Sequence, residues 1–454
     1  MPKQSRPNRP NVLLIVADDH QAGAIGALGH PVVRTPTLDG LVARGTAFTR
    51  AYYMGGLVPA LCAPARAALL TGTHLFSAQA APELHPARHD VAIDPARPTL
   101  PELFRRAGYE TFVTGKWHND GAALRRSFSR GERIFLGGMC DHRRVPLHDY
   151  APARAFPSAR VRFERGFSTE LFCDAARRFV ARRAADPRPF FAYVALTSPH
   201  DPRTPPAAYA RQYRPAKLPL PGNFLPEHPF DNGEMGVRDE RLASHPLRPA
   251  AVRRHLADYY GMISHHDAEI GRLLDTIART GQAENTIVAY VSDHGLALGG
   301  HGLLGKQNLY EHSVRVPLLL SGPGVRAGGR DAELAYSFDL FPTLCDLAAV
   351  DCPRDILGRS LVPRLRRPGR SGRESVFALY RDCQRMVADR RWKLIQYDVG
   401  GRKRLQLFDL ESDPGETRDL SGLARHRPRV ARLRRRLDEW QNDVGDRWMR
   451  EFPE

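Results

Sequence analysis

The sequence predicts an α/β protein with a large, mainly parallel mixed sheet flanked by helices, followed by a smaller α+β domain with an antiparallel sheet. Two observations predict it. Apolar runs alternate with helix-like segments over most of the chain, and short strand-like runs follow one another near the C-terminus. The first pattern is typical of parallel sheets and the second of hairpins. The 454 residues suffice for two domains, which we place at 1–350 and 351–454.

Five short runs in the first part are predicted to be strands buried on both faces. They are rich in Val, Ile, Leu and Phe and do not alternate with polar residues, as expected for the inside of a parallel sheet. The predicted strands are Val12–Ala17, Thr111–Thr114, Phe190–Leu196, Thr286–Val291 and Val316–Leu320.

Helices are predicted between these strands, at Thr99–Ala107, Asp174–Ala185 and Pro249–Thr280. The first starts at a capping Thr and ends before Gly108, and the last ends at Gly281, as helices commonly do. The segment Leu218–Arg241 is rich in Pro and Gly and has no periodicity, so we expect a long loop there.

The C-terminal part has a different character. The runs VFALY, RMVAD, RWKLIQY and LQLFDL between Val376 and Leu410 are predicted to be strands, and the turn VGGRK at 399–403 predicts a hairpin. A charged helix is predicted from Arg427 to Asn442. This alternation of short strands and turns predicts the antiparallel sheet of the smaller domain.

Composition limits the classes of function. The net charge of +17 comes from 67 Lys and Arg against 50 Asp and Glu, and it has three possible meanings: nucleic-acid binding, attraction of an anionic substrate, or an Arg-rich proteome. No nucleic-acid-binding motif is present, so we expect no nucleic-acid partner. No apolar stretch approaches the roughly 20 residues that span a bilayer, and no signal peptide is evident, so we expect no membrane partner and a cytoplasmic location. The six scattered cysteines form no C-x-x-C pair and do not indicate a disulfide scaffold.

Carboxylates follow two of the predicted strands directly. Asp18 and Asp19 come after the first strand, and Asp293 and His294 come after the run that ends at Val291. Ligands bind beyond the carboxyl ends of parallel strands, and adjacent carboxylates repel one another unless a cation holds them. One Asp alone would be explained as a helix cap. Two such strand ends favour a shared site for a hard divalent ion such as Ca²⁺ or Mg²⁺.

Three further polar clusters follow strand-like runs. Lys116 and His118 follow TFVT, His200 follows FFAYVAL between two prolines, and Lys306 lies in the Gly-rich segment HGLLGKQNLYEH. A Lys can neutralise an anionic group, and a His can move a proton near neutral pH. Each residue alone would be explained as a surface residue, but their repeated position after strands favours one site.

The segment LCAPARAALLTG, Leu61–Gly72, places Cys62 at the start of a predicted helix. Pro64 suits the first helical turn, and Arg66 follows one turn on. A helix N-terminus attracts anions and stabilises a thiolate. From the residues alone, Cys62 is either a reactive thiol or a buried structural cysteine.

The pattern C-x-P-x-R followed by L-T-G resembles the signature of the type I sulfatases, in the alkaline-phosphatase-like superfamily. Several other segments resemble the same family in the same order, and together they cover most of the chain. They are NVLLIVADDHQ, AGYETFVTGKWH, SPHDPRTPP, SDHGLALGGHG, YEHSVRVPLL and LFDLESDPGE. The resemblance implies the alkaline-phosphatase-like fold and a hydrolase that cleaves sulfate esters, possibly of a carbohydrate.

The resemblance also implies a modified active site. A formylglycine-generating enzyme would oxidise Cys62 to formylglycine. The modified residue would then ligate one Ca²⁺, or Mg²⁺ or Mn²⁺, together with Asp18, Asp19, Asp293 and His294. Many sulfatases have Asn where His294 stands, and the signature here ends LTGT, with Thr73, where LTGR is frequent.

The family mechanism assigns a role to each remaining residue. The hydrated aldehyde, polarised by the metal and Arg66, would attack sulfur. Lys116, Lys306 and the metal would neutralise the sulfate oxygens, and His200 with Lys306 would protonate the leaving alcohol. His118 would then take the proton of the second hydroxyl, so that the aldehyde is regenerated and sulfate leaves.

Two other functions stay open at this point. A phosphonate monoester hydrolase or phosphodiesterase would use the same formylglycine and fits a His in the metal set. A non-catalytic binder of anionic glycans would use the basic surface. Segments 137–149 and 224–235 are expected at the pocket mouth, where His142, Arg143 and Arg203 are candidate substrate contacts. Neither the particular ester nor the oligomeric state follows from the sequence.

Overall fold

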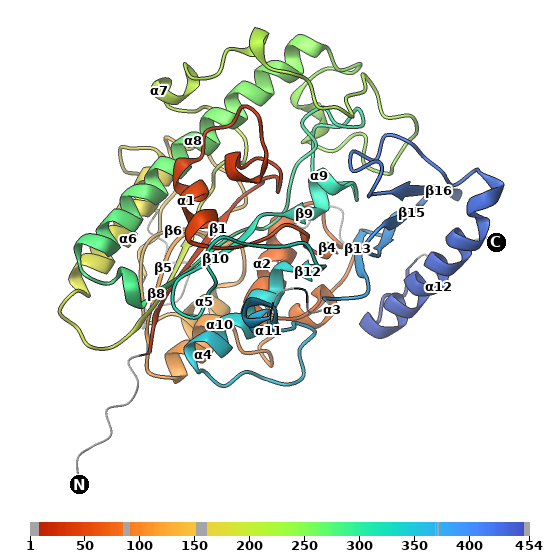
Figure 1. The fold of residues 1–454 in the computed structure, drawn as a ribbon. Coiled ribbons are helices and arrows are strands. Elements are labelled where there is room, and N and C mark those ends of the chain that lie inside the picture. The colour runs from red at the N-terminus through yellow and green to blue at the C-terminus, as the bar shows by residue number, and fades with distance from the viewer. Residues whose placement is uncertain (1–8, 85–90, 151–160, 368, 370–371, 449–454) are drawn as a thin grey trace.

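An eight-stranded mixed sheet forms the centre of the molecule (Figure 1), in a computed structural model that describes residues 9–84, 91–150, 161–367, 369 and 372–448. The strand order is β11-β2-β10-β8-β1-β7-β5-β6. Five neighbouring strands are parallel: β8 (Thr286–Ser292), β1 (Asn11–Ala17), β7 (Phe190–Ala195), β5 (Glu110–Lys116) and β6 (Arg130–Phe135). The predicted large, mainly parallel sheet is confirmed.

The other three strands make the sheet mixed. β10 (Leu318–Ser321) runs antiparallel to both β8 and β2 (Gly45–Phe48), and β11 (Gly329–Asp331) forms the edge. The predicted strand from Val316 to Leu320 is divided, because Pro317 has no N–H to donate to a ladder. Val316 belongs to β9 (Arg315–Val316), which pairs with β3 (Ala51–Tyr52) in a small sheet completed by β12 (Ala335–Tyr336).

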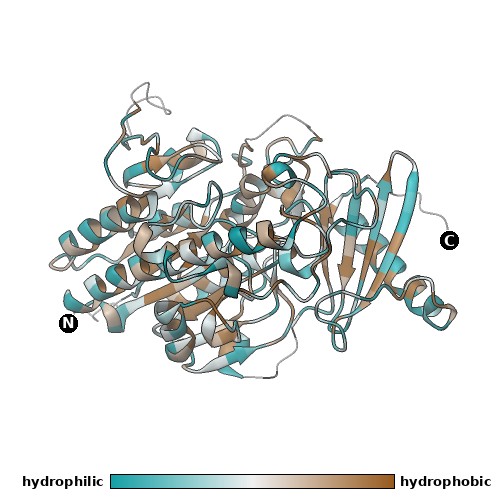
Figure 2. Ribbon diagram, turned by 90° about the horizontal axis from the view of Figure 1, so that it is seen from above, coloured by the Kyte–Doolittle hydropathy of each residue, from teal (hydrophilic) through white to brown (hydrophobic). Residues whose placement is uncertain are grey.

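Helices cover both faces of the central sheet, and alternate residues of β1 point into two different cores. Leu13 and Ile15 pack with α1 (Pro36–Arg44), α6 (Ser168–Arg182) and α8 (Pro249–Arg279). Val12, Leu14 and Val16 face the core that contains α2 (Cys62–Thr71), α4 (Leu100–Arg106) and α10 (Leu340–Ala348). Figure 2 shows the result, with hydrophobic strands inside and hydrophilic segments on the outer helices.

Local capping explains where the predicted helices start and end. At α4, Thr99 accepts the N–H of Glu102, and Glu102 accepts the N–H of Thr99, which forms a capping box. α6 starts earlier than predicted because Glu170 accepts the N–H of Phe167.

Within the described part of the chain, no helix has the length and apolar character needed to cross a bilayer.

The remaining helices are short. The α-helices are α3 (Leu75–Ala78), α5 (Gly121–Ser127), α7 (Ala207–Ala210), α9 (Glu311–Val314) and α11 (Val362–Arg366). Single turns of 3₁₀-helix lie at Gly26–Leu28, Pro215–Lys217, Glu240–Leu242, Ala283–Asn285, Ser337–Asp339 and Ala424–His426. Two of these turns lie at or near the ends of the segment 218–241, which is otherwise irregular, as the sequence predicted.

The C-terminal part forms another sheet, of order β16-β15-β14-β13-β4. Four of its strands are consecutive and antiparallel, as predicted, and α12 (Arg427–Val444) packs against them: β13 (Val376–Tyr380), β14 (Gln384–Ala388), β15 (Trp392–Val399) and β16 (Arg402–Asp409).

The fifth strand of this sheet, β4 (Gly55–Gly56), comes from the N-terminal part and pairs in parallel with β13. Only Gly fits at position 55, because a Cβ there would lie 1.7 Å from the carbonyl oxygen of Leu379. The sheet therefore combines both parts of the chain, and the division at residue 350 stays a prediction.

Candidate active site

The polar residues predicted at strand ends meet at one edge of the central sheet. The adjacent strands β8, β1, β7 and β5 are parallel, so their carboxyl ends lie side by side. The backbone joins them directly: the N–H of Asp18 donates to Ser198 O at 3.2 Å, and that of Asp293 to Ala17 O at 3.2 Å. The residues at or shortly after these strand ends are Asp293 and His294, Asp18 and Asp19, His200, and Lys116 and His118.

Three buried aspartates form the base of the site. Asp18 Oδ2 lies 2.6 Å from Lys116 Nζ, and Asp19 Oδ1 lies 2.9 Å from Lys306 Nζ. Asp293 Oδ1 accepts the backbone N–H of Asp19 at 3.2 Å. Burial and the neighbouring Cys62 raise the pKa of Asp18 to about 8, as expected where negative groups are crowded together.

Cys62 starts α2 and points at these aspartates. Its Sγ lies 3.3 Å from Asp18 Oδ1, 3.2 Å from His294 Nε2 and 3.6 Å from Lys306 Nζ. Burial opposes ionisation, but Lys116, Lys306 and His294 outweigh it and lower the pKa of the thiol well below its usual range. The side chain is therefore placed in an electropositive pocket, where a negative charge is stabilised.

The two remaining basic groups are fully buried. Arg66, one turn after Cys62, donates Nη1–H to the carbonyl oxygen of Lys116 at 2.9 Å and places Nη2 3.0 Å from Asp293 Oδ2. Burial opposes the protonation of Lys116, but Asp18 outweighs it and raises the pKa of the ammonium group. Both groups therefore stay cationic.

His118 and His200 differ in their charge state. Burial lowers the pKa of His118 to about 4, and its buried Nδ1 has no hydrogen-bond partner within the described part of the chain. Burial also opposes protonation of His200, but Asp19 outweighs it and raises the pKa of His200 to about 10. One neutral and one cationic imidazole in one site provide a proton acceptor and a proton donor.

The donor set fits a divalent cation. Two groups of residues place their ligand atoms within 4.8 Å of one another, one made of Asp18, Cys62, Asp293 and His294, the other of Asp18, Asp19, Cys62 and His200. Among the residues that the structure describes, none donates a hydrogen bond to the buried Oδ2 of Asp19, so this oxygen can coordinate a cation. His200, predicted to be a proton donor, thus also lies among the possible ligands.

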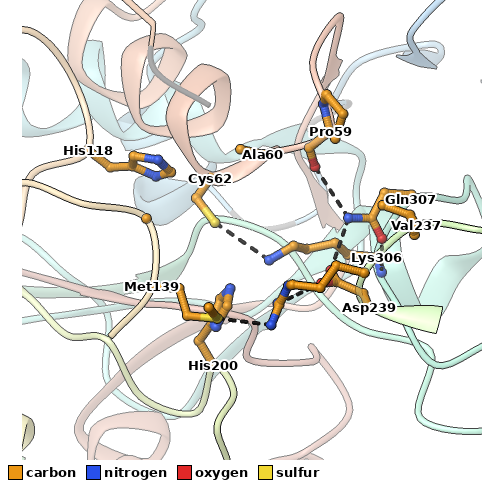
Figure 3. A pocket seen from close by; sticks show the side chains of 12 residues that line it. Pro59, Ala60, Cys62, His118, Met139, His200, Val237, Asp239, Lys306 and Gln307 are labelled. Carbon is orange, nitrogen blue, oxygen red and sulfur yellow. Dashed lines mark hydrogen bonds and ion pairs between the residues drawn. The ribbon is translucent and has the colours of Figure 1, made fainter. Parts of the chain in front are cut away.

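A cavity of about 320 Å³ opens at Cys62 (Figure 3). His118 enters from one side, and Lys306 and His200 from the other. The wall also contains Pro59, Ala60, Gly138, Met139, Val237, Arg238, Asp239 and Gln307. All six predicted catalytic residues therefore lie at the cavity or directly beneath it.

The three predicted substrate contacts do not line this cavity. His142 is buried, and its Nε2 lies 2.9 Å from the carbonyl oxygen of His200, so it supports that residue from behind. Arg143 lies over the ring of Phe167, and the guanidinium of Arg203 is close to His255. Their role as substrate contacts stays a prediction.

Sequence reasoning missed the wall formed by Val237, Arg238 and Asp239. The predicted mouth segment 137–149 does supply Gly138 and Met139, but the segment 224–235 ends just before this wall. One feature of the sequence could have indicated this wall: the consecutive charged residues Arg238, Asp239 and Glu240 near the end of an otherwise Pro- and Gly-rich loop.

Comparisons with known proteins identify the class. Residues 10–350 match the family described as sulfatase, and residues 299–443 match the family described as N-sulphoglucosamine sulphohydrolase, C-terminal. Because the first match spans most of the chain, the chain belongs to the sulfatase family, in the alkaline-phosphatase-like superfamily. With that family it belongs to the sulfuric ester hydrolases.

Individual relatives extend over nearly the whole chain. An N-acetylglucosamine-6-O-sulfatase of Bacteroides thetaiotaomicron is 24% identical over 98% of this chain and 88% of its own. A structure in complex with its substrate D-glucosamine-2-N,6-O-disulfate has a TM-score of 0.80 at 23% identity and covers 97% of this chain and 99% of its own. The phosphonate monoester hydrolase of Agrobacterium radiobacter has a TM-score of 0.74 at 22% identity, with 96% of each chain covered. These two structures confirm the fold.

Proposed function

We propose that this sulfatase hydrolyses sulfate esters of a carbohydrate, with a formylglycine derived from Cys62 and one divalent metal ion. We expect the ion to be Ca²⁺, with Mg²⁺ or Mn²⁺ as alternatives. The position of Cys62 carries the proposal, because its Sγ lies within 3.6 Å of Asp18, His294 and Lys306 at the base of the cavity. A saccharide is favoured because one relative that matches nearly the whole chain is named an N-acetylglucosamine-6-O-sulfatase, and one matching structure contains its substrate D-glucosamine-2-N,6-O-disulfate.

The residues around Cys62 suit a sulfate group. Lys116 and Lys306 are buried and cationic, so each can neutralise a sulfate oxygen in a water-poor site, where such charges act strongly. Asp18, Asp19, Asp293 and His294 would hold the metal ion. A divalent cation there supplies positive charge for the sulfate oxygens, and formylglycine at position 62 supplies the nucleophilic oxygen.

The proton transfers follow from the two histidines. His200 is cationic and lies with Lys306 on one side of the cavity, so it can donate a proton to the departing alcohol oxygen. His118 is neutral and lies on the other side, so it can accept a proton from the group at position 62. Each histidine is thus in the charge state that its role requires.

Phosphonate monoester hydrolysis is the second candidate. It is supported by His294 in the proposed metal set and by the similarity in fold to a phosphonate monoester hydrolase. The family match favours sulfate esters, so we rank the phosphonate activity second.

The test uses protein produced together with a formylglycine-generating enzyme. Mass spectrometry of the peptide that contains Cys62 should show a loss of about 18 Da, the change from thiol to aldehyde. The same protein should then hydrolyse 4-nitrophenyl sulfate and sulfated glucosamines faster than 4-nitrophenyl phenylphosphonate.

Two variants serve as controls. Cys62→Ala should lose both the mass change and the activity, whereas Cys352→Ser, a partly exposed cysteine far along the chain, should keep both. Faster phosphonate than sulfate turnover would select the second candidate. A protein that binds sulfated glycans but, once converted, hydrolyses neither ester would be the non-catalytic binder.

A further inference from the structure

The charged triplet Arg238, Asp239 and Glu240 ends the long irregular loop at the wall of the cavity. Each of the three residues makes hydrogen bonds to a different part of the site, although none is among the possible metal ligands and none is bonded to Cys62. Arg238 remains partly exposed, with 42% of its side chain accessible, whereas Asp239 and Glu240 are buried.

Arg238 is connected to His200 through Asp201. Its Nη1 and Nη2 lie 2.5 and 2.9 Å from the two carboxylate oxygens of Asp201, a two-pronged contact. Asp201 in turn holds the ring of His200, since Nδ1 lies 2.7 Å from its carbonyl oxygen and 3.4 Å from its Oδ1. The other ring nitrogen, Nε2, therefore faces the cavity and Asp19, from whose Oδ2 it lies 3.9 Å.

Asp239 is connected to Lys306 through Gln307. Its Oδ2 accepts Nε2–H of Gln307 at 2.9 Å, and Gln307 Oε1 accepts the backbone N–H of Lys306 at 3.0 Å. Nη2 of Arg238 also contacts Asp239, at 2.6 Å, so the two chains of contacts are joined.

Glu240 fixes the segment just before Lys306. Its two carboxylate oxygens accept the backbone N–H groups of Leu304 and Gly305, each at 2.7 Å. The triplet therefore restrains both groups that lie on the side of the cavity opposite His118.

We propose that Arg238 and Asp239 are positioning residues that orient His200 and Lys306 toward the leaving-group oxygen of the substrate. This inference rests on the proposed function, in which these two groups protonate the departing alcohol. Proton donation helps most when the leaving group is poor, and a small displacement of the donor is costly. Loss of the restraint on His200 and Lys306 should therefore slow the hydrolysis of esters with poor leaving groups more than that of esters with good ones.

The experiment compares two aryl sulfates that differ in their leaving group. Arg238→Ala, Arg238→Lys and Asp201→Asn are assayed with 4-nitrophenyl sulfate, which has a good leaving group, and with phenyl sulfate, which has a poor one. We expect kcat/KM for phenyl sulfate to fall at least about tenfold further than that for 4-nitrophenyl sulfate. Arg238→Lys keeps the charge but lacks the fork, so it should show the same selective loss in a minimally changed protein.

The matched control is Arg241→Ala, which removes an exposed arginine from the same segment and should change neither rate. Equal losses on both esters, or no loss, would overturn the proposal, because a merely structural role does not depend on the leaving group.

A second measurement does not depend on turnover. Hydrogen exchange of the peptide that contains residues 304–307 should be faster in Asp239→Ala than in Arg241→Ala, because Gln307 loses its acceptor. Unchanged exchange would overturn the link to Lys306. If the converted wild-type protein hydrolyses no sulfate ester, the proposed function fails, while the exchange result still tests the contacts.

Discussion

Arg66 holds the carboxylate of Asp293 by two contacts, with Nε 3.1 Å and Nη2 3.0 Å from Oδ2, and both side chains are fully buried. The other oxygen, Oδ1, accepts the backbone N–H groups of Asp19 and His294 at 3.2 and 3.0 Å. Arg66 therefore fixes a carboxylate that connects the ends of β1 and β8, from a helix that lies on one face of the sheet.

Removal of this guanidinium should destabilise the protein. Arg66→Met leaves Asp293 buried without its partner, a change that costs about 3–5 kcal/mol in comparable buried pairs. Arg66→Lys should cost less, because it keeps the charge and loses only the fork. The free energy of unfolding in urea measures both, with the exposed Arg435→Met as the control. A stable Arg66→Met protein would show that the pair contributes little.

Calcium should stabilise the folded protein, because a cation relieves the crowding of Asp18, Asp19 and Asp293. After treatment with EDTA, added Ca²⁺ should raise Tm, with a gain of about 2.7 kcal/mol at one hundred times Kd. Asp19→Asn should weaken binding at least about tenfold, since it reduces the charge of the ligand set. Calorimetric titration measures this, and the exposed Asp275→Asn should behave like the wild type. An identical calcium response in Asp19→Asn would show that Asp19 does not bind the ion.

Gly138 touches the ring of His118. A Cβ at this position would lie 2.7 Å from both Cε1 and Nε2 of the imidazole, so Gly138→Ala must displace the ring. We expect kcat to fall roughly a hundredfold with little change in KM, because the proposed proton acceptor moves while the groups proposed to bind sulfate stay in place. Gly222→Ala is the matched control, since a Cβ there meets open space. Unimpaired turnover in Gly138→Ala would exclude a role for the position of His118.

His301 should make the protein sensitive to acid. Burial lowers its pKa to about 4, and its neutral ring accepts from Asn223 at Nδ1 and donates Nε2–H to Glu416 O. Because the unfolded chain is protonated near its ordinary value of 6.5, folding stability from this residue is present above pH 6.5 and is lost as the pH falls toward 4. The loss attributable to His301 is about 3 kcal/mol.

The variant His301→Asn isolates this effect. Asn cannot titrate, and it tolerates the left-handed backbone at this position, where φ is 54°. Urea unfolding at pH 7 and pH 4 should show a smaller acid-induced loss of stability in the variant than in the wild type. Parallel losses in both proteins would assign the acid sensitivity to other groups.

Much of the fold was predictable because its main signals are local. The buried strands appear in the sequence as continuous apolar runs, the N-cap of α4 appears as a Thr, and a Gly follows the C-cap of α8. The short strands β3, β4 and β12 were not predicted, because two residues carry no periodicity and depend on partners that are distant in sequence.

Part of the candidate site was also predictable from local signals in the sequence. Residues such as Asp18 and His200 follow apolar runs directly, whereas the order of the strands that makes them neighbours is a property of the whole sheet. Arg238 and Asp239 were not found, because their loop has no pattern and their partners Asp201 and Gln307 come from other segments. His142 resembled a pocket residue, but a backbone carbonyl of this chain occupies its ring nitrogen.

The pairing of β4 with β13 has a consequence for how the chain matures. Gly55 and Gly56 stand a few residues before Cys62, and their partners Leu379 and Tyr380 are synthesised only after most of the chain. Such distant contacts form late in folding. During synthesis, the surroundings of Cys62 therefore stay incomplete until the ribosome has nearly finished, and one of the earliest stretches to emerge is among the last to be enclosed.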